Sequence, residues 1–140
     1  MTQEEKDLLL KDLCTRLPYE PICEFTDIED EITATAKLGY SLRDFVSNKV
    51  LVKPYLRPIS IMTEDEKDTL RDYGWVVDNN TIYSDCGMDA NGQEYGSIQM
   101  SIDDTKWLMD FLNSHHFDYR GLIEKGLALE APEGMYNIED

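Results

Sequence analysis

The longest uninterrupted helical pattern, in residues 103–132, sets the strongest limit on the fold of this chain. Ser101 and Asp103 are both candidate N-caps, because a short side-chain oxygen can accept an amide hydrogen of the first turn. Asn113 and the other polar residues of this helix are expected to face water. The helical pattern becomes irregular at residues 113–114. The apolar stripe consists of Trp107, Leu108, Phe111 and Leu112.

Two histidines follow this helix. His115 and His116 fall at or just past its C-terminus, where a partly charged imidazole can interact with free carbonyls. A second, shorter helix is expected from a cap at Asp118 to a stop at Gly126. We therefore predict a C-terminal helical hairpin followed by a short extended tail.

Two capping boxes predict two further helices. Thr2 and Glu5 open a helix that ends before Pro18, and Thr63 and Glu66 open a shorter, charged helix. The first helix is expected to bury a stripe of leucines, which are Leu8, Leu9, Leu10, Leu13 and Leu17.

Residues 18–58 change from helical to strand composition. Short strands at this spacing predict a small antiparallel sheet or an SH3-like barrel. Residues 53–58 are expected to leave the sheet, because two prolines remove donors from the hydrogen-bond ladder. The expected strands are 22–25, 32–36, 45–46 and 50–52.

Two more strands, 75–77 and 81–83, are expected around a polar turn, and Asn91-Gly92 is a type I′ turn signal. These features predict a β-meander inserted between the later helical regions. The fold class is therefore α+β, in a single domain of residues 1–140. It would combine a helix and small sheet or barrel (1–62) with helices and a meander (63–140).

The net charge of −16 over 140 residues bounds the choice of partner. It argues against direct binding to nucleic acid or to an anionic membrane, whose phosphates are neutralised by Lys and Arg. The acidic start MTQEEKDLLL lacks the pattern of a signal peptide, and no segment approaches the length of a membrane span. Three cysteines without CxxC spacing, Cys14, Cys23 and Cys86, indicate reduced thiols. We therefore expect a cytoplasmic protein.

Three segments of the chain resemble a known family. They are LLLKDLCTRLPYEP at 8–21, VKPYLRPISIMTEDE at 52–66 and HHFDYRGLIEKGLALEAPEGMY at 115–136. Together they are similar to a family of small bacterial and bacteriophage proteins to which no activity is assigned. The resemblance implies a mobile-element context and supplies no catalytic residue or cofactor. We expect the three segments to pack on one another.

No complete catalytic or metal-binding motif accompanies these patterns. Residues 85–92 resemble a calcium loop, but acids are missing at Gly87 and Ile98, which favours a hairpin loop. His115 and His116 cannot both point one way in a regular element, and no second ligand pair has useful spacing. The sequence therefore predicts no catalytic residue, no cofactor and no metal.

Two segments are candidates for contact with a partner. Tyr55, Leu56 and Arg57 lie between two prolines, and aromatic and arginine side chains are enriched in interface cores. The alternative is a strap that joins sheet to helix with Tyr55 and Leu56 buried. The second segment contributes His115, His116, Asp118, Tyr119 and Arg120.

The leading functional hypothesis is a non-enzymatic protein-interaction module of phage or mobile-element origin. One alternative is an acidic decoy that imitates nucleic acid and inhibits a DNA- or RNA-binding protein. Another is an enzyme with a site near His115, His116 and Asp118. The identity of the partner and the oligomeric state stay open.

Overall fold

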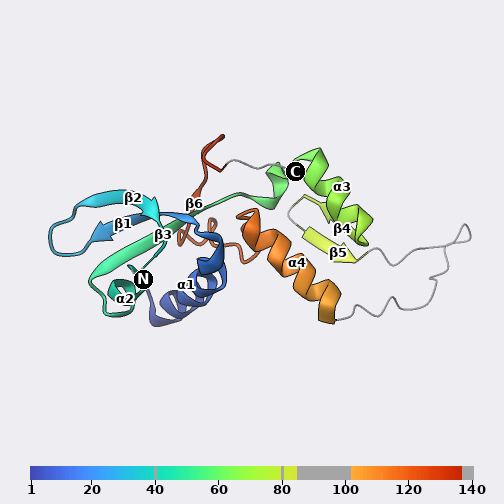
Figure 1. The fold of residues 1–140 in the computed structure, drawn as a ribbon. Helices are drawn as coiled ribbons and strands as arrows, with labels where there is room; N and C mark the ends of the chain where they lie inside the picture. The colour runs from blue at the N-terminus through green and yellow to red at the C-terminus, as the bar shows by residue number, and fades with distance from the viewer. Residues whose placement is uncertain (40, 80, 85–101, 137–140) are drawn as a thin grey trace, which may run out of the picture.

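The computed structural model describes residues 1–39, 41–79, 81–84 and 102–136. It has the expected α+β class, with helices beside small sheets (Figure 1). The elements are α1 (Gln3–Arg16), η1 (Leu17–Tyr19), β1 (Ile22–Asp27), β2 (Thr33–Lys37), α2 (Ser41–Val46), β3 (Val50–Leu56), η2 (Ile59–Ile61), α3 (Glu64–Asp72), β4 (Trp75–Asp78), β5 (Thr81–Ser84), α4 (Ile102–Ser114) and β6 (Leu129–Glu130).

The main sheet has the strand order β2-β1-β3-β6. β1 pairs antiparallel with both β2 and β3, as the strand composition predicts, while β6 adds a short parallel edge to β3. β4 and β5 form a separate antiparallel hairpin. The described strands make open sheets rather than a closed barrel, so the prediction of a small sheet is confirmed and the barrel alternative is wrong.

One predicted strand is a helix. Residues 45–46 belong to α2, in which Phe45 is buried and Val46 is exposed. Two apolar residues in a row fit both a strand and a helix turn, whereas Leu42 together with Phe45 and Val46 has the i, i+3, i+4 spacing of a helical turn.

β3 continues through Pro54 to Leu56, so the prediction that residues 53–58 leave the sheet is wrong for residues 53–56. Pro54 lies opposite Cys23 of β1. On the other side of β3, β6 reaches only Tyr55 and Leu56. Within the described strands Pro54 thus borders an open edge, where a residue without an N–H is tolerated.

The predicted second helix of the C-terminal hairpin is absent from residues 118–126, of which 118–121 are irregular and 122–126 form turns. The Asp118 carboxylate accepts the amide hydrogens of Leu122 at 2.9 Å and Ile123 at 3.0 Å, as a cap would. Gly121 and Gly126, however, have φ angles of +70° and +73°. These left-handed residues interrupt the backbone before a helical ladder can extend.

Both capping boxes are confirmed, at Thr2 with Glu5 and at Thr63 with Glu66. Asp103 lies within α4 and is not its N-cap. Ser101, the Asn91-Gly92 turn and the loop at 85–92 fall outside the described residues.

The apolar side chains form two clusters. The first joins α1, the main sheet and α2, and includes Leu9, Leu13 and Leu56. The second joins α3, α4 and the β4–β5 hairpin, and includes Trp75 and Leu112. Two details of the predicted stripes are wrong, because Leu17 is exposed where the helix changes to η1, and Asn113 is buried. Asn113 is held there by Tyr119, whose hydroxyl donates to Asn113 Oδ1 at 2.8 Å.

Candidate functional site

A buried polar junction lies where β3 ends, and it brings together two segments that the sequence singles out. The backbone of Arg57 forms a parallel bridge with Phe117. Its N–H donates to His116 O at 2.7 Å, and its carbonyl accepts from Asp118 N at 2.9 Å. The candidates at 55–57 and 115–120 are therefore neighbours in the structure.

A buried ion pair stands at the centre of this junction. The Arg57 guanidinium binds the Glu66 carboxylate through two hydrogen bonds of 2.8 Å, and Glu66 is fully buried. His115 Nδ1 lies 2.7 Å from Glu66 Oε2, and the Thr63 amide donates to Oε1 at 3.0 Å. Burial would raise the pKa of Glu66, but the hydrogen bonds from Arg57, His115 and Thr63 outweigh it and hold that pKa well below its usual range.

A second buried cluster connects α1 to the same segment. Arg16 Nε donates to Asp12 Oδ2 at 2.7 Å, and Arg120 Nε donates to Asp12 Oδ1 at 3.0 Å. Arg16 also donates to Phe117 O at 2.7 Å, and both arginines lie over the Tyr119 ring. One carboxylate thus holds two guanidinium groups from distant parts of the chain.

The third part of the junction is a stacked pair. The rings of His116 and Tyr136 lie 3.7 Å apart, and His116 Nδ1 has no hydrogen-bond partner among the described residues. Burial, together with Arg16 and Arg57, lowers the pKa of His116 to about 4. The Tyr136 hydroxyl donates to Tyr55 O at 2.7 Å, and burial raises its pKa to about 12. These contacts join the C-terminal segment to β3.

The segments 8–21, 52–66 and 115–136, which were expected to pack on one another, meet at this junction. Residues 8–21 contribute Asp12 and Arg16, and residues 52–66 contribute Arg57 and Glu66. Residues 115–136 contribute the partners of both pairs. The expectation that these segments pack on one another is therefore confirmed.

The candidate interaction residues are largely engaged in holding the fold. Leu56 is fully buried in the first apolar cluster and Tyr55 is half-buried, so both serve the packing, as the strap interpretation expected, although they belong to β3 and not to a strap outside the sheet. His115 and Asp118 make internal hydrogen bonds. A hollow of about 210 Å³ does lie beside Asp118, but it is smaller than most ligand sites, and the carboxylate is already occupied by two amides.

Sequence reasoning missed Glu66, Asp12 and Arg16 as members of the junction. Each lies on a helix, among other charged residues that resemble a solvated face. The partners lie up to 108 residues away, so spacing along the chain carries no signal of the contact. The position of Glu66 in a capping box was the one local sign that its side chain is fixed.

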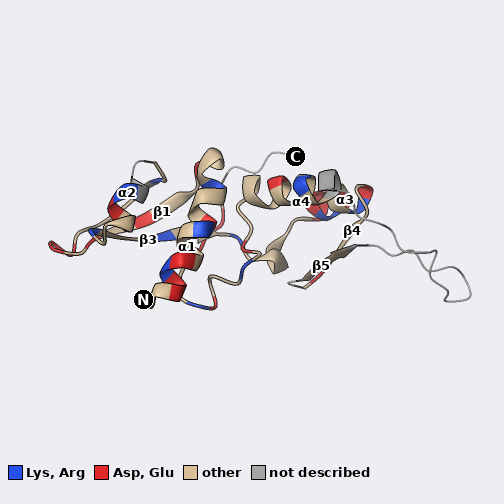
Figure 2. Cartoon of the chain, turned by 90° about the horizontal axis from the view of Figure 1, so that it is seen from below, with Lys and Arg blue, Asp and Glu red and all other residues tan. Residues whose placement is uncertain are grey.

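The acidic residues are distributed over several elements. Figure 2 shows them on α1, α2, α3 and the far end of the main sheet, with Lys and Arg between them. In this view the described acidic residues do not form two parallel rows. A decoy of nucleic acid would need such rows to imitate phosphates.

In comparisons of the chain with family models, curated proteins and solved structures, nothing matches. In the part of the chain that the structure describes, no helix is both long and apolar enough to cross a membrane.

Proposed function

We propose that the protein is a non-enzymatic interaction module that binds an extended segment of another protein along the edge of β2. We further propose that it acts in the cytoplasm and derives from a phage or other mobile element. The origin rests on the three resembling segments. The observation that carries the binding mode is the exposure of β2.

All five residues of β2 are exposed, and the strand pairs only with β1 among the described strands. Asp27 N donates to Ile32 O and Leu38 N donates to Pro21 O. Because hydrogen-bonded pairs alternate along an antiparallel ladder, the backbone groups of Thr33, Thr35 and Lys37 face away from β1. These free donors and acceptors are a template for another strand.

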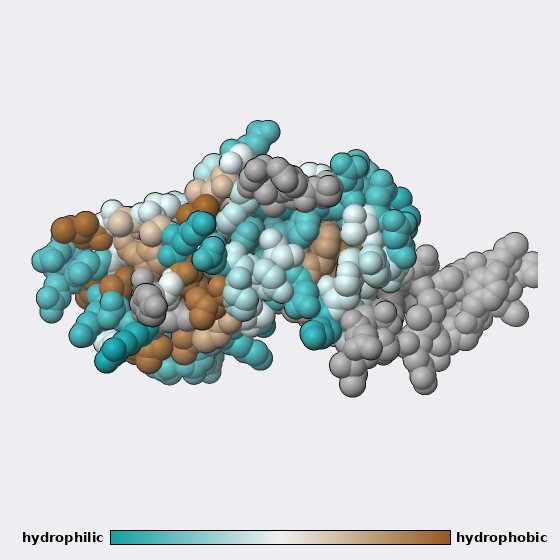
Figure 3. Space-filling model, viewed as in Figure 1, coloured by the Kyte–Doolittle hydropathy of each residue, from teal (hydrophilic) through white to brown (hydrophobic). Residues whose placement is uncertain are grey.

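Exposed apolar side chains lie at one end of this edge. Ile32, which precedes β2, is 65% exposed, and Ile28 and Leu51 are exposed as well. Ile28 and Ile32 lie in the turn that joins β1 to β2, whereas Leu51 belongs to β3 and is separated from β2 by β1. Figure 3 shows hydrophobic atoms at the end of the molecule that holds the β1–β2 turn. An added strand would cover part of this surface and gain affinity from it.

The charge of this region favours a basic partner. Glu29, Asp30 and Glu31 are exposed in the turn before β2, and the whole chain carries a net charge of −16. An extended segment with Lys or Arg near one end would therefore be drawn to the edge. The decoy and the enzyme are less favoured, because the acids are scattered and His115 and Asp118 serve the fold.

Thr35 offers a test that separates the β2 edge from the rest of the surface. Thr35→Pro removes one outward N–H and leaves the ladder to β1 intact, while Thr35→Ala keeps that N–H. The tagged wild type and both variants are used to capture partners from host lysate at low and high salt. Circular dichroism first confirms that all three fold alike.

We expect one partner that wild type and Thr35→Ala capture at both salt concentrations and that Thr35→Pro does not capture. Peptides that tile this partner should then reproduce the same order of affinities by isothermal titration calorimetry. Equal capture by Thr35→Pro would exclude the β2 edge. Capture of a nucleic-acid-binding protein only at low salt would favour the decoy instead.

A further inference from the structure

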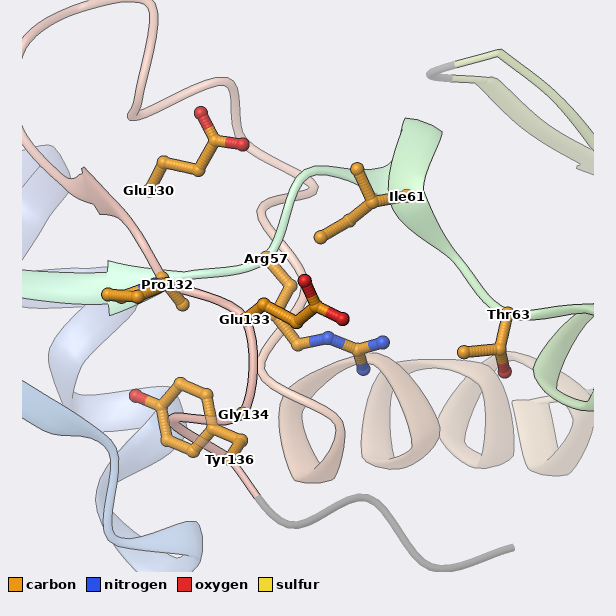
Figure 4. A pocket seen from close by; sticks show the side chains of 9 residues that line it. Arg57, Ile61, Thr63, Glu130, Pro132, Glu133, Gly134 and Tyr136 are labelled. Atoms are coloured by element: carbon orange, nitrogen blue, oxygen red, sulfur yellow. The ribbon is translucent and has the colours of Figure 1, made fainter.

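A groove of about 460 Å³ lies between η2 and the segment that follows β6. Figure 4 shows Pro132 and Tyr136 on one side and Ile61 and Thr63 on the other, with Arg57 between them. The volume falls within the range of small-ligand sites. The groove is lined by Arg57, Ile61, Thr63, Glu130, Ala131, Pro132, Glu133, Gly134 and Tyr136.

The charge in the groove is negative, although an arginine lines it. Arg57 is 8% exposed, and both of its terminal nitrogens bind Glu66, so its charge is already compensated. Glu130 and Glu133 are exposed and make no ion pair with any described residue. Figure 4 shows the Glu133 carboxylate pointing from the C-terminal segment toward the side of Ile61 and Thr63. Glu130 also lines the groove, but Figure 4 shows its carboxylate apart from that of Glu133, so Glu133 is the carboxylate that lies between the two sides of the groove.

The groove also has an apolar wall and fixed sides. Ile61, which is 49% exposed, and the exposed Pro132 give each side of the groove one apolar residue, which suits an aliphatic stem lying between them. The Ala131 amide donates to Leu56 O at 2.8 Å, so one end of the C-terminal segment is tied to β3. Tyr136 ties the other end through its hydrogen bond to the Tyr55 carbonyl. A site that is already shaped needs little ordering when a ligand enters.

We propose that this groove binds a basic side chain, with its aliphatic stem between Ile61 and Pro132 and its cationic head on Glu133. Guanidinium and ammonium groups on such a stem are the side chains of arginine and lysine. The site is separate from β2, because β2 and β6 are opposite edges of the main sheet. Binding in this groove can therefore be tested independently of strand pairing along β2.

The test is a titration of the full chain with N-acetyl-arginine methylamide, followed by NMR chemical shifts and calorimetry. N-acetyl-norleucine methylamide, which keeps the stem without the charge, and inorganic phosphate are the comparison probes. Glu133→Gln removes one carboxylate of the groove. Glu4→Gln, at an exposed position on α1, is the matched variant with the same change of net charge.

We expect the arginine probe to bind, with shifts at Ile61 and Gly134, and Glu133→Gln to weaken binding about tenfold or more. Glu4→Gln and Thr35→Pro should bind as wild type does. Equal binding of the norleucine probe would overturn the proposal, as would an equal loss in Glu4→Gln. Binding of phosphate in preference to the cation would overturn it too, because Arg57 would then be the recognising group.

Discussion

At the residue scale, Glu66 both closes a capping box and pairs with Arg57, whereas Glu5 only closes a capping box. Both Glu66 and Glu5 occupy the third helical position of a capping box and accept the amide hydrogen of the cap residue. Glu66 in addition is the buried counter-ion of Arg57. The two positions therefore allow the ion pair to be separated from the cap.

Replacing Glu66 by Gln should destabilise the protein strongly. The substitution leaves the Arg57 charge buried without a counter-ion, which typically costs about 3–5 kcal/mol. Glu5→Gln alters an exposed box and should lower the free energy of unfolding far less. Urea unfolding followed by tryptophan fluorescence measures both. Similar losses in the two variants would mean that the ion pair contributes nothing beyond the cap.

His116 should make stability depend on pH below neutrality. Its pKa is about 4 in the folded protein and about 6.5 in the unfolded chain, so the unfolded chain binds the proton more readily. The stabilisation is complete above pH 6.5 and is lost as the pH falls from 6.5 to 4, by roughly 1–3 kcal/mol.

The matched variant for this pH dependence is His116→Asn. Asparagine tolerates the left-handed backbone that His116 adopts at φ +62°, and it does not titrate. Urea unfolding at pH 7.5, 5.5 and 4.5 should show a smaller loss of stability in the variant than in the wild type. Parallel pH profiles would show that His116 does not titrate between folded and unfolded states as proposed.

At the scale of elements, the sequence predicts those whose signals are local. The capping boxes and leucine periodicity locate α1, and strand composition locates β1 and β2. α2 was missed because it is only six residues long and Phe45-Val46 alone resembles a strand, although Leu42, Phe45 and Val46 have the i, i+3, i+4 spacing of one helical turn. The turns at 118–126 were misread as a helix because a cap and buried leucines mark both structures, and the φ angles of Gly121 and Gly126 decide between them.

We expect the Tyr136 side chain to attach the C-terminal segment to the main sheet. Its hydroxyl accepts from Ile22 N at 2.8 Å and donates to Tyr55 O, so Tyr136→Phe leaves two backbone groups without this partner. We expect a loss of about 1–3 kcal/mol in the free energy of unfolding. Tyr83→Phe, at an exposed position on β5, is the control and should stay near the wild-type value. Equal stability of all three proteins would contradict this attachment.

At the scale of the whole molecule, the junction connects two apolar clusters that share no local sequence signal. Arg57 follows a strand of the first cluster, and its partners Glu66 and His115 lie on or beside helices of the second. Asp12 and Arg120 add a link from α1 to the segment that leaves α4. Pairs of this kind depend on the final path of the chain, so the sequence could predict the packing of three segments without identifying the charged contacts.

Because these links cross from one cluster to the other, we expect the two clusters to unfold together. Trp75 reports on the second cluster by fluorescence. Cys23 reports on the first, because its thiol is fully buried and burial raises its pKa to about 12, so it should react only after unfolding. The measurement uses a chain in which Cys14 and Cys86 are replaced by Ser.

The two probes should give the same urea midpoint, and Asp12→Asn should shift both midpoints equally, because its carboxylate holds arginines from both sides of the junction. If Cys23 reacted at a lower urea concentration than that at which Trp75 changes, the clusters would be separate folding units. The ion pairs would then be contacts between two units, the first of which would combine residues 1–56 with the segment 122–128.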